Sequence, residues 1–243
     1  MSKRSEIRLA LPSKGRMAEE VLEMLSRAGL QVYKPNPRQY RAFIPSIPEL
    51  TILFQRSGDI VTSVRDGSVD FGISGWDIVS ERRSENGNII LLLSDLKISR
   101  CTLNVIVPET MQEISTMADL ANLQKELDQP LRVATKFPNL TKSFFLEKGI
   151  PDIDMISAEG TLEIAPIIGY ADIIVDLIST GTTLRDNRLK MIEDGLVLSS
   201  QSCLIANRSA LKNRPEVLAM ARQLLEVIVA YLRGAEKIGR AHV

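Results

Sequence analysis

Short apolar segments alternate with segments of helical spacing along almost the whole chain, and this alternation constrains the fold more than any other feature. Residues 7–11 form a first apolar run. Residues 17–28 then place Val21 and Leu25 on one helical face, and Gly29 is a natural helix stop. Repeated strand–helix alternation is the pattern of an α/β protein. The sequence therefore predicts an α/β fold.

The same pattern predicts the remaining elements. Strands are expected over residues 40–45, 50–55, 71–74, 89–93, 102–107, 131–135, 172–176, 189–200 and 202–207. Helices are expected over residues 58–65, 76–80, 139–148, 162–168 and 215–233, with a further start after residue 183. Ser57 is expected to cap one of these helices, and Pro215 to open the longest. Polar residues 82–88 and 108–128 are expected to be flexible.

The elements divide into two α/β lobes. Lobe I is expected to comprise residues 1–100 plus 189–237, and lobe II residues 101–188. The chain would then cross between the lobes twice, near residues 100 and 188. Ligand sites commonly lie between domains, so we expect a cleft between the two lobes.

Composition excludes several classes of protein. Thirty lysine and arginine residues balance thirty aspartate and glutamate residues, so the basic excess of a nucleic-acid-binding protein is missing. No apolar run approaches the roughly 18–20 residues that cross a bilayer. The amino terminus lacks the apolar stretch of a secretory signal, so we expect a cytoplasmic protein. Cys101 and Cys203 stand far apart in apolar contexts and are interpreted as two buried thiols.

The single histidine, His242, argues against histidine-dependent catalysis, which would have to operate from the extreme tail. It lies in the terminal run 238–243, Ile-Gly-Arg-Ala-His-Val, which resembles a translated sequencing adapter. We expect this run to be a non-native tail, and a genuine tail is the alternative.

A phosphate-binding loop is the strongest chemical signal. An apolar strand ends in Asp176, and a loop of small residues leads into a helix. Backbone N–H groups at a helix start bind phosphate, and glycine permits close approach. The loop supplies Ser179, Thr180, Gly181, Thr182 and Thr183. A plain helix cap rich in serine and threonine is the alternative. Neither a P-loop nor a Rossmann glycine motif occurs.

Three further segments carry charge beside expected strand ends. Lys14, Gly15 and Arg16 join a strand to a helix and suit a polyphosphate, although a solvated loop is an equal alternative. Arg56 ends a strand and is either a phosphate clamp or a surface arginine. Glu163 could orient a ribose or cap a helix.

The segment from Glu159 through Leu184 closely resembles the signature of the ATP phosphoribosyltransferase family, which catalyses the first step of histidine biosynthesis. Residues 9–16, 70–75 and 134–140 are similar to further landmarks of that family, so the resemblance covers nearly the whole chain. It implies a two-lobed, type II periplasmic-binding-protein-like fold with an inter-lobe cleft. It also implies a glycosyltransferase that uses ATP, 5-phosphoribosyl diphosphate and Mg²⁺.

The resemblance implies roles for the residues named above. The loop from Ser179 to Thr183 would hold the 5-phosphate, and Asp176 the ribose hydroxyls. Lys14, Gly15 and Arg16, with Arg56, would face the pyrophosphate and the phosphates of ATP, and Glu163 would lie beside the ribose. Mg²⁺ is expected on the substrate pyrophosphate, with no metal ligands from the protein. The transition state needs alignment and charge stabilisation, with no covalent nucleophile.

The family has a short form, which works with a separate regulatory subunit, and a long form with an added histidine-binding domain. We expect a truncated long form and a homo-oligomer, with a regulatory subunit as a partner if the form is short. Two other functions stay open. One is a non-enzymatic small-molecule receptor of the same bilobed fold, and the other is a regulatory subunit that binds a phosphoribosyl group.

Overall fold

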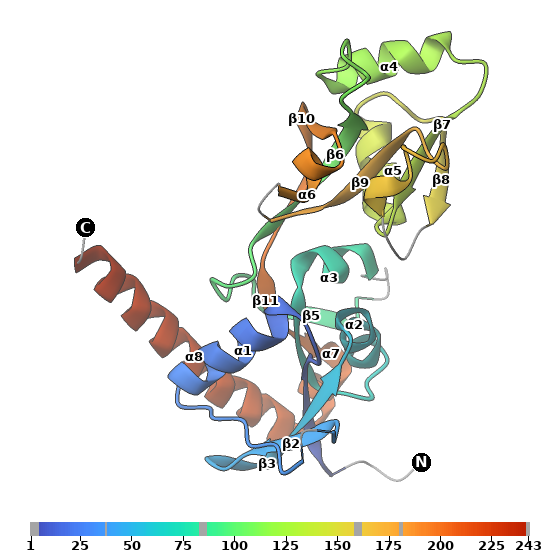
Figure 1. Cartoon of the computed structure of the whole chain (residues 1–243). Coiled ribbons are helices and arrows are strands. Elements are labelled where there is room, and N and C mark those ends of the chain that lie inside the picture. Colours follow the sequence, from blue (N-terminus) through green and yellow to red (C-terminus); the bar gives the residue numbers. More distant parts are fainter. Residues whose placement is uncertain (1–4, 37, 83–86, 158–161, 180–181, 242–243) are drawn as a thin grey trace. The chain divides into compact units, whose positions relative to one another are not determined.

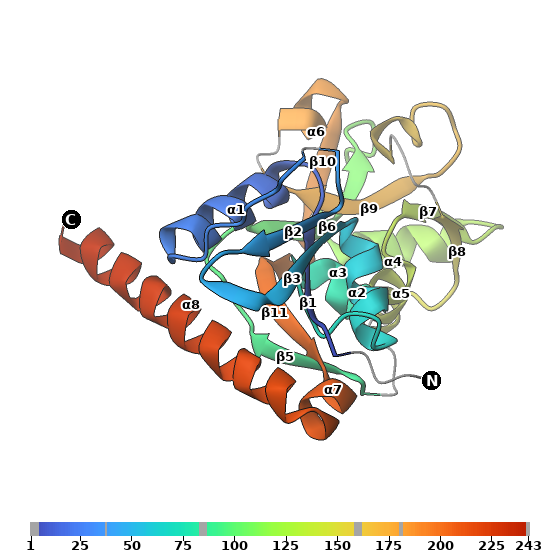
Figure 2. The same ribbon diagram turned by 90° about the horizontal axis from the view of Figure 1, so that it is seen from below.

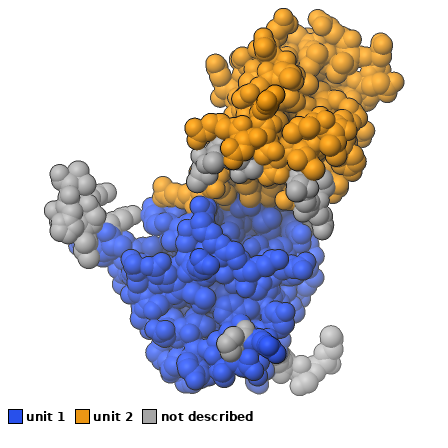
Figure 3. All heavy atoms as spheres, in the orientation of Figure 1, with its two compact units in different colours: residues 1–99, 201–243 blue, residues 100–200 orange. Residues whose placement is uncertain are grey.

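The computed structural model describes residues 5–36, 38–82, 87–157, 162–179 and 182–241. Its backbone contacts divide the chain into two units (Figures 1 and 3). Unit 1 comprises residues 1–99 and 201–243, and unit 2 comprises residues 100–200. Each unit contains one β-sheet of its own. The α/β fold class is therefore confirmed.

Unit 1 is built on a mixed six-stranded sheet with the order β2-β3-β1-β4-β11-β5. The strands are β1 (Ile7–Pro12), β2 (Arg41–Ile44), β3 (Ile47–Gln55), β4 (Phe71–Gly75), β5 (Ile89–Leu93) and β11 (Ser202–Asn207). β1 is parallel to both β3 and β4, whereas β11 is antiparallel to β4 and β5. The three parallel strands therefore end at one edge of the sheet, which we call the carboxyl edge of unit 1.

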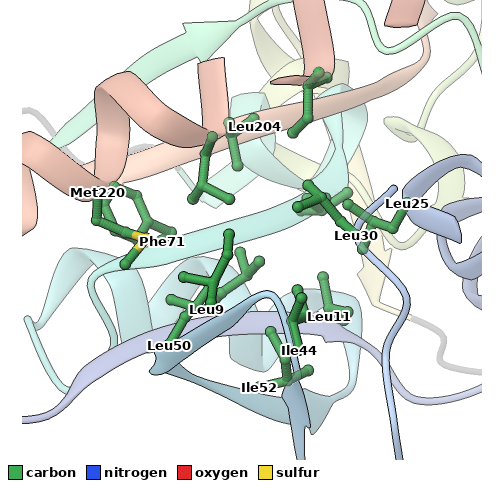
Figure 4. Close-up of a cluster of buried hydrophobic side chains, with 14 of the residues drawn as sticks. Leu9, Leu11, Leu25, Leu30, Ile44, Leu50, Ile52, Phe71, Leu204 and Met220 are labelled. Carbon is green, nitrogen blue, oxygen red and sulfur yellow. The ribbon is translucent and has the colours of Figure 1, made fainter. Parts of the chain in front are cut away.

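Helices cover both faces of this sheet (Figure 2). The helices of unit 1 are α1 (Arg16–Arg27), α2 (Ser57–Arg65), α3 (Trp76–Arg82), α7 (Arg208–Asn213) and α8 (Pro215–Ala241). Apolar residues of α1 and α8 pack with β1, β3 and β4 in one cluster, in which Leu9, Leu25 and Leu204 are almost fully buried (Figure 4). A second cluster joins α2 and α3 to the opposite face through Ile60, Val64 and other residues. Parallel strands covered on both faces tend to be apolar, and all five residues of β4, near the middle of the sheet, are accordingly buried.

Unit 2 contains a five-stranded sheet with the order β10-β6-β9-β7-β8. Its strands are β6 (Cys101–Pro108), β7 (Leu131–Thr135), β8 (Ile153–Ser157), β9 (Ile173–Ile178) and β10 (Leu189–Ser200). Its helices are α4 (Met117–Glu126), α5 (Pro138–Glu147) and α6 (Thr182–Asp186), with a 3-10 turn, η1, at Leu162–Ile164. β7 is parallel to β8 and β9, so these three strands share a carboxyl edge of unit 2.

The expected return of the chain near residue 188 was wrong. β10 pairs antiparallel with β6 from Leu189 to Ser200, and it therefore belongs to unit 2. The boundary lies at residues 200 and 201, where β10 ends and β11 begins. The two strands were predicted with their correct bounds and follow each other directly in the sequence, but they complete different sheets.

Several element predictions also need correction. α4 occupies part of the segment expected to be flexible, and a capping box between Thr116 and Asp119 fixes its start. The expected helix over residues 162–168 is only the turn η1, because Pro166 has no N–H to continue a helix. Ser57 is the first residue of α2, and Arg56 is its N-cap.

α8 is longer than expected and extends to Ala241. The side chains of residues 238–243 lie outside the described part of the structure, so the non-native tail stays a prediction. No helix among the described residues combines the length and the low polarity that crossing a bilayer demands.

Candidate functional site

The carboxyl edge of unit 1 gathers the loops that follow β1, β3 and β4. Pro12 is in register with Gln55, and the backbone N–H of Ser13 donates to the carbonyl of Gln55 over 2.8 Å. The loop that contains Lys14 therefore starts beside the start of α2. In open α/β sheets, ligands bind at this edge, where the connections from neighbouring strands diverge. Here the connection after β1 leads to β2 and β3, on one side of β1 in the strand order, and the connection after β4 leads to β5, at the opposite end of that order.

Four exposed cations surround this edge. Lys14 precedes the N-cap of α1, Arg16 is the first residue of α1, and Arg56 is the N-cap of α2. Arg82 comes from the last turn of α3, and its guanidinium lies over Gly58, where an added Cβ would be 2.6 Å from Cζ. Arg82 was missed by the sequence analysis, because nothing in the sequence indicates that the last turn of α3 meets the first turn of α2. The group suits a ligand with several negative charges.

Two glycines permit the backbone course at this edge. Gly15, the N-cap of α1, has a φ of 80° and a ψ of 178°, a conformation almost restricted to glycine, although no atom lies within 4 Å of an added Cβ. Gly75 has the opposite constraint. An added Cβ there would lie 2.3 Å from Oδ1 of Asp77, which is buried at the start of α3. The first glycine is needed for its dihedral angles and the second for space.

The carboxyl edge of unit 2 places an acid, a base and a hydroxyl on adjacent strands. Thr135 ends β7 in register with Val175 of β9, and its buried hydroxyl donates to the carbonyl of Val175 over 2.8 Å. Lys136 directly follows β7, and Asp176 follows Val175 within β9. The two side chains interact electrostatically, because the Lys136 ammonium acts to lower the pKa of the Asp176 carboxyl. Lys136 belongs to a segment that carries the family resemblance, but no role was predicted for it.

Asp176 lies in a partly buried position that disfavours its charge. Burial raises the pKa of its carboxyl group, and the nearby Glu163 carboxylate adds to the rise. The backbone N–H of Leu177, which donates to Oδ1 over 2.8 Å, and the Lys136 ammonium act in the opposite direction. Asp176 was expected to end its strand, whereas β9 continues to Ile178.

The predicted phosphate loop is described only in part. Ser179 is exposed and directly follows β9. Thr180 and Gly181 lie outside the described residues, and of Thr182 and Thr183 only the backbone, in the first turn of α6, is described. α6 spans five residues, so its dipole is small. The predicted cradle for the 5-phosphate is therefore still a prediction.

Within units, the structure groups the predicted residues into two sets. Lys14, Gly15, Arg16 and Arg56 share the carboxyl edge of unit 1, and Glu163, Asp176 and Ser179 belong to unit 2. Ligands of α/β sheets bind at the carboxyl ends of the strands. Lys136 directly follows the predicted strand 131–135, so it could have been predicted as a site residue on this ground. The expected cleft between the lobes remains a prediction.

The described residues include no metal-binding cluster, and one cavity of unit 1 lies away from its carboxyl edge. In the described ranges, no group of three or more histidine, cysteine, aspartate or glutamate side chains could hold a metal ion. A cavity of about 620 Å³ in unit 1 is lined by Ser5, Asp70 and Arg214, among others. Ser5 and Asp70 precede β1 and β4, so this cavity lies at the opposite edge of the sheet from the four cations.

The sequence comparisons point to one family. The sequence model of the family described as "ATP phosphoribosyltransferase" matches residues 56–232. The chain is 42% identical over 233 residues to ATP phosphoribosyltransferase 1, chloroplastic, of Arabidopsis thaliana, covering 95% of this chain and 57% of the plant protein. It thus spans little more than half the length of that relative. The ATP phosphoribosyltransferase of Brucella suis is 40% identical over 229 residues, covering 91% of this chain and 99% of the bacterial protein.

The structural comparisons give the fold. An ATP phosphoribosyl transferase (HisG:HisZ) complex from Thermotoga maritima matches with a TM-score of 0.69 and 24% identity, over 92% of this chain and 99% of that chain. The alkanesulfonate-binding protein SsuA from Xanthomonas axonopodis pv. citri, bound to MOPS, matches with a TM-score of 0.56 and 15% identity, over 98% and 78%. The fold therefore resembles that of periplasmic binding proteins, as the family resemblance implied.

Proposed function

Because the chain belongs to the ATP phosphoribosyltransferase family, we propose that it transfers the 5-phosphoribosyl group of 5-phosphoribosyl diphosphate to N1 of ATP. Pyrophosphate is released, and the reaction is the first step of histidine biosynthesis. The observation that carries this proposal is the 40% identity that extends over 99% of the Brucella enzyme. A likeness confined to the fold would support a receptor as well as an enzyme.

The chemistry makes few demands on protein side chains. The N1 lone pair of adenine forms a bond to the anomeric carbon of the ribose, and the bond from that carbon to the pyrophosphate oxygen breaks. The bonding electrons leave with pyrophosphate, so negative charge grows on the leaving group while positive charge grows on the ribose ring. Catalysis then consists of holding two anionic substrates in line and stabilising the leaving group.

Each set of residues has a role in this proposal. Arg56, Lys14 and Arg16 bind pyrophosphate and the phosphates of ATP, and the turn at Gly15 brings the backbone to them. Asp176 accepts hydrogen bonds from the ribose hydroxyls, and Glu163 lies beside the ribose. In each unit the residues stand at the edge where α/β sheets bind ligands, which supports these roles.

The proposed 5-phosphate cradle comprises Ser179, Thr180, Gly181, Thr182 and Thr183, and its support is the sequence resemblance. Mg²⁺ would arrive on the substrate pyrophosphate and neutralise part of its charge. The proposal therefore assigns no protein ligand to the ion.

Partners and compartment remain proposals. The Thermotoga structure is described as a HisG:HisZ complex, and we propose by analogy that this chain assembles with further copies or with a regulatory subunit. The names of the plant relatives place those proteins in the chloroplast, while the Brucella name gives no compartment. We propose a cytoplasmic enzyme, because both proposed substrates are highly charged phosphate esters that do not cross a bilayer unaided.

A two-step experiment tests the activity. Calorimetry with 5-phosphoribosyl diphosphate and Mg²⁺ should show binding, and ATP should then trigger release of pyrophosphate. Binding without ATP-dependent pyrophosphate release, even with a candidate regulatory subunit added, would indicate a regulatory protein. If 5-phosphoribosyl diphosphate does not bind at all, a receptor for another small molecule becomes the better interpretation.

A further inference from the structure

Glu20 joins two features of unit 1 that are far apart in the sequence. It lies in the second turn of α1, four residues after Arg16, and its Oε1 is 3.6 Å from Nε of that arginine. Its other carboxylate oxygen, Oε2, accepts a hydrogen bond from the hydroxyl of Ser99. One half-buried carboxylate thus contacts an arginine of the proposed anion site and the last residue of unit 1 before the chain enters unit 2.

Ser99 has an unusual backbone conformation. Its φ is 56°, in the left-handed region that non-glycine residues rarely adopt, and it is only 8% exposed. The segment before it is held against β11, because Ser202 accepts from the N–H of Leu96 and donates to the carbonyl of Ile98. A strained residue persists only where its surroundings hold it, and the bond to Glu20 is one of these restraints.

The contact with Ser99 distinguishes Glu20 from an ordinary surface acid. Glu23 and Arg27 form a pair of the same spacing on the same helix, but both side chains are about two-thirds exposed. Such pairs contribute little because both side chains must be ordered for a weak attraction in water. Glu20 is already ordered by a buried partner, so it can restrain Arg16 at a lower entropic cost.

We propose that Glu20 and Ser99 are positioning residues that hold Arg16 ready to bind the pyrophosphate group. The Glu20 carboxylate approaches the Arg16 guanidinium at Nε. Ordering Arg16 in advance lowers the entropy that anion binding must otherwise remove. The proposal rests on the proposed function in one respect, namely that Arg16 binds the pyrophosphate group.

Removing the Ser99 hydroxyl tests this without altering any charge. The probe is inorganic pyrophosphate with Mg²⁺, titrated calorimetrically into the full chain, so that no catalytic activity is needed. Ser99→Ala keeps the backbone strain, and Ser99→Gly relieves it. Both should weaken pyrophosphate binding by about 2- to 12-fold, the range expected when one long side chain loses its prior order. Ser99→Gly should remain as stable as the wild type, so weaker binding by this variant cannot be attributed to misfolding.

The double variant decides whether the effect passes through Arg16. Once Arg16→Ala has weakened binding, adding Ser99→Ala should cause no further loss, because no guanidinium remains to be ordered. Glu23→Gln is the matched control on the same helix and should bind as the wild type does. If Arg16→Ala weakens binding but Ser99→Ala and Ser99→Gly do not, the positioning role is wrong while the proposed function stands. If Arg16→Ala itself has no effect, Arg16 is outside the anion site and both assignments fail.

Discussion

Asp176 is a residue at which binding and stability make opposite demands. Its carboxylate is proposed to receive the ribose hydroxyls, yet burial and Glu163 raise its pKa and so penalise the charged form in the folded protein. A raised pKa in the folded state means that this group favours folding when protonated. That contribution is present at acid pH and is lost as the pH rises through the folded-state pKa.

Asp176→Asn should therefore have two opposite effects. The melting temperature at neutral pH should rise, because burial penalises a neutral amide less than a charged carboxylate, and the difference from the wild type should vanish at acid pH. The value of kcat/KM should fall by about 10- to 150-fold, since a hydrogen bond to a charged group is lost. Thermal melts across pH and steady-state kinetics check both effects. An active, unstabilised variant would contradict the assignment.

The two charges beside Asp176 should shift its titration in opposite directions. Lys136→Gln removes a charge that favours the carboxylate, so the acid limb of the kcat/KM profile should move to higher pH. Glu163→Gln removes a like charge, so the limb should move to lower pH. Lys142→Gln, an exposed lysine on α5, is the control and should leave the limb in place. Shifts of the same sign in the first two variants would exclude this electrostatic arrangement.

At the scale of single elements, substitutions of glycine can distinguish the cost of a strained backbone from the cost of crowding. Gly15 and Gly234 both leave open space for a Cβ, but only Gly15 has a positive φ, while Gly234 lies inside α8. An added methyl group therefore meets no atom at either site. The dihedral angles alone decide the outcome, which makes the two positions a matched pair.

Gly15→Ala should destabilise the protein by about 1–3 kcal/mol, the usual cost of a strained backbone conformation, and should also weaken pyrophosphate binding. Gly234→Ala should stabilise it by about 0.4–1 kcal/mol, because alanine reduces the freedom of the unfolded chain. Urea unfolding of both variants measures the difference. Equal effects of one sign would mean that the conformation of Gly15 is not a constraint.

Gly72→Ala probes crowding in β4. An added Cβ would lie 2.5 Å from Cγ2 of Ile60 and 3.0 Å from Cγ2 of Val64, so α2 would have to move away from the sheet. Overpacking of this kind costs about 1–3 kcal/mol. The same urea unfolding should show that loss. Ile60→Ala removes Cγ2, so the double variant Gly72→Ala with Ile60→Ala should lose less stability than the sum of the two single losses. Wild-type stability in the single variant Gly72→Ala would mean that α2 shifts freely.

Most individual elements were predictable, because buried parallel strands and amphipathic helices have strong local patterns. β7 has the predicted bounds, and β4 and β11 differ by one residue or none. β10 was assigned to the wrong lobe because sheet membership depends on pairing with β6, which is distant in sequence.

The same limit applies to the prediction of the candidate site. Lys14, Arg16 and Arg56 could be chosen by type and spacing, whereas Arg82 over Gly58 and Glu20 with Ser99 depend on tertiary contacts.

At the scale of the whole molecule, the two units have separate apolar cores and separate sheets. In unit 1 a buried ion pair connects the sheet to the start of α8. Nη1 of Arg214 is 2.8 Å from Oδ1 of Asp70, which is fully buried and also accepts from the backbone N–H of Arg8. Removing only the cation of such a pair leaves a buried carboxylate uncompensated.

Arg214→Met should cost about 3–5 kcal/mol, and the loss should be confined to unit 1. Hydrogen exchange should quicken in β1 and β4 while β6 and β9 keep their wild-type rates. Arg132→Met, which breaks a half-exposed pair with Asp172 in unit 2, should have a smaller effect, confined to that unit. Faster exchange throughout both units in either variant would show that they unfold as one.

The order β4-β11-β5 has a consequence for synthesis on the ribosome. β5 leaves the ribosome more than a hundred residues before β11, the strand that must separate it from β4. Unit 2 is a continuous segment whose first and last strands already pair, Cys101 with Ser200. The nascent chain can therefore complete its inserted half first. Unit 1 remains an open sheet until the ribosome has made β11.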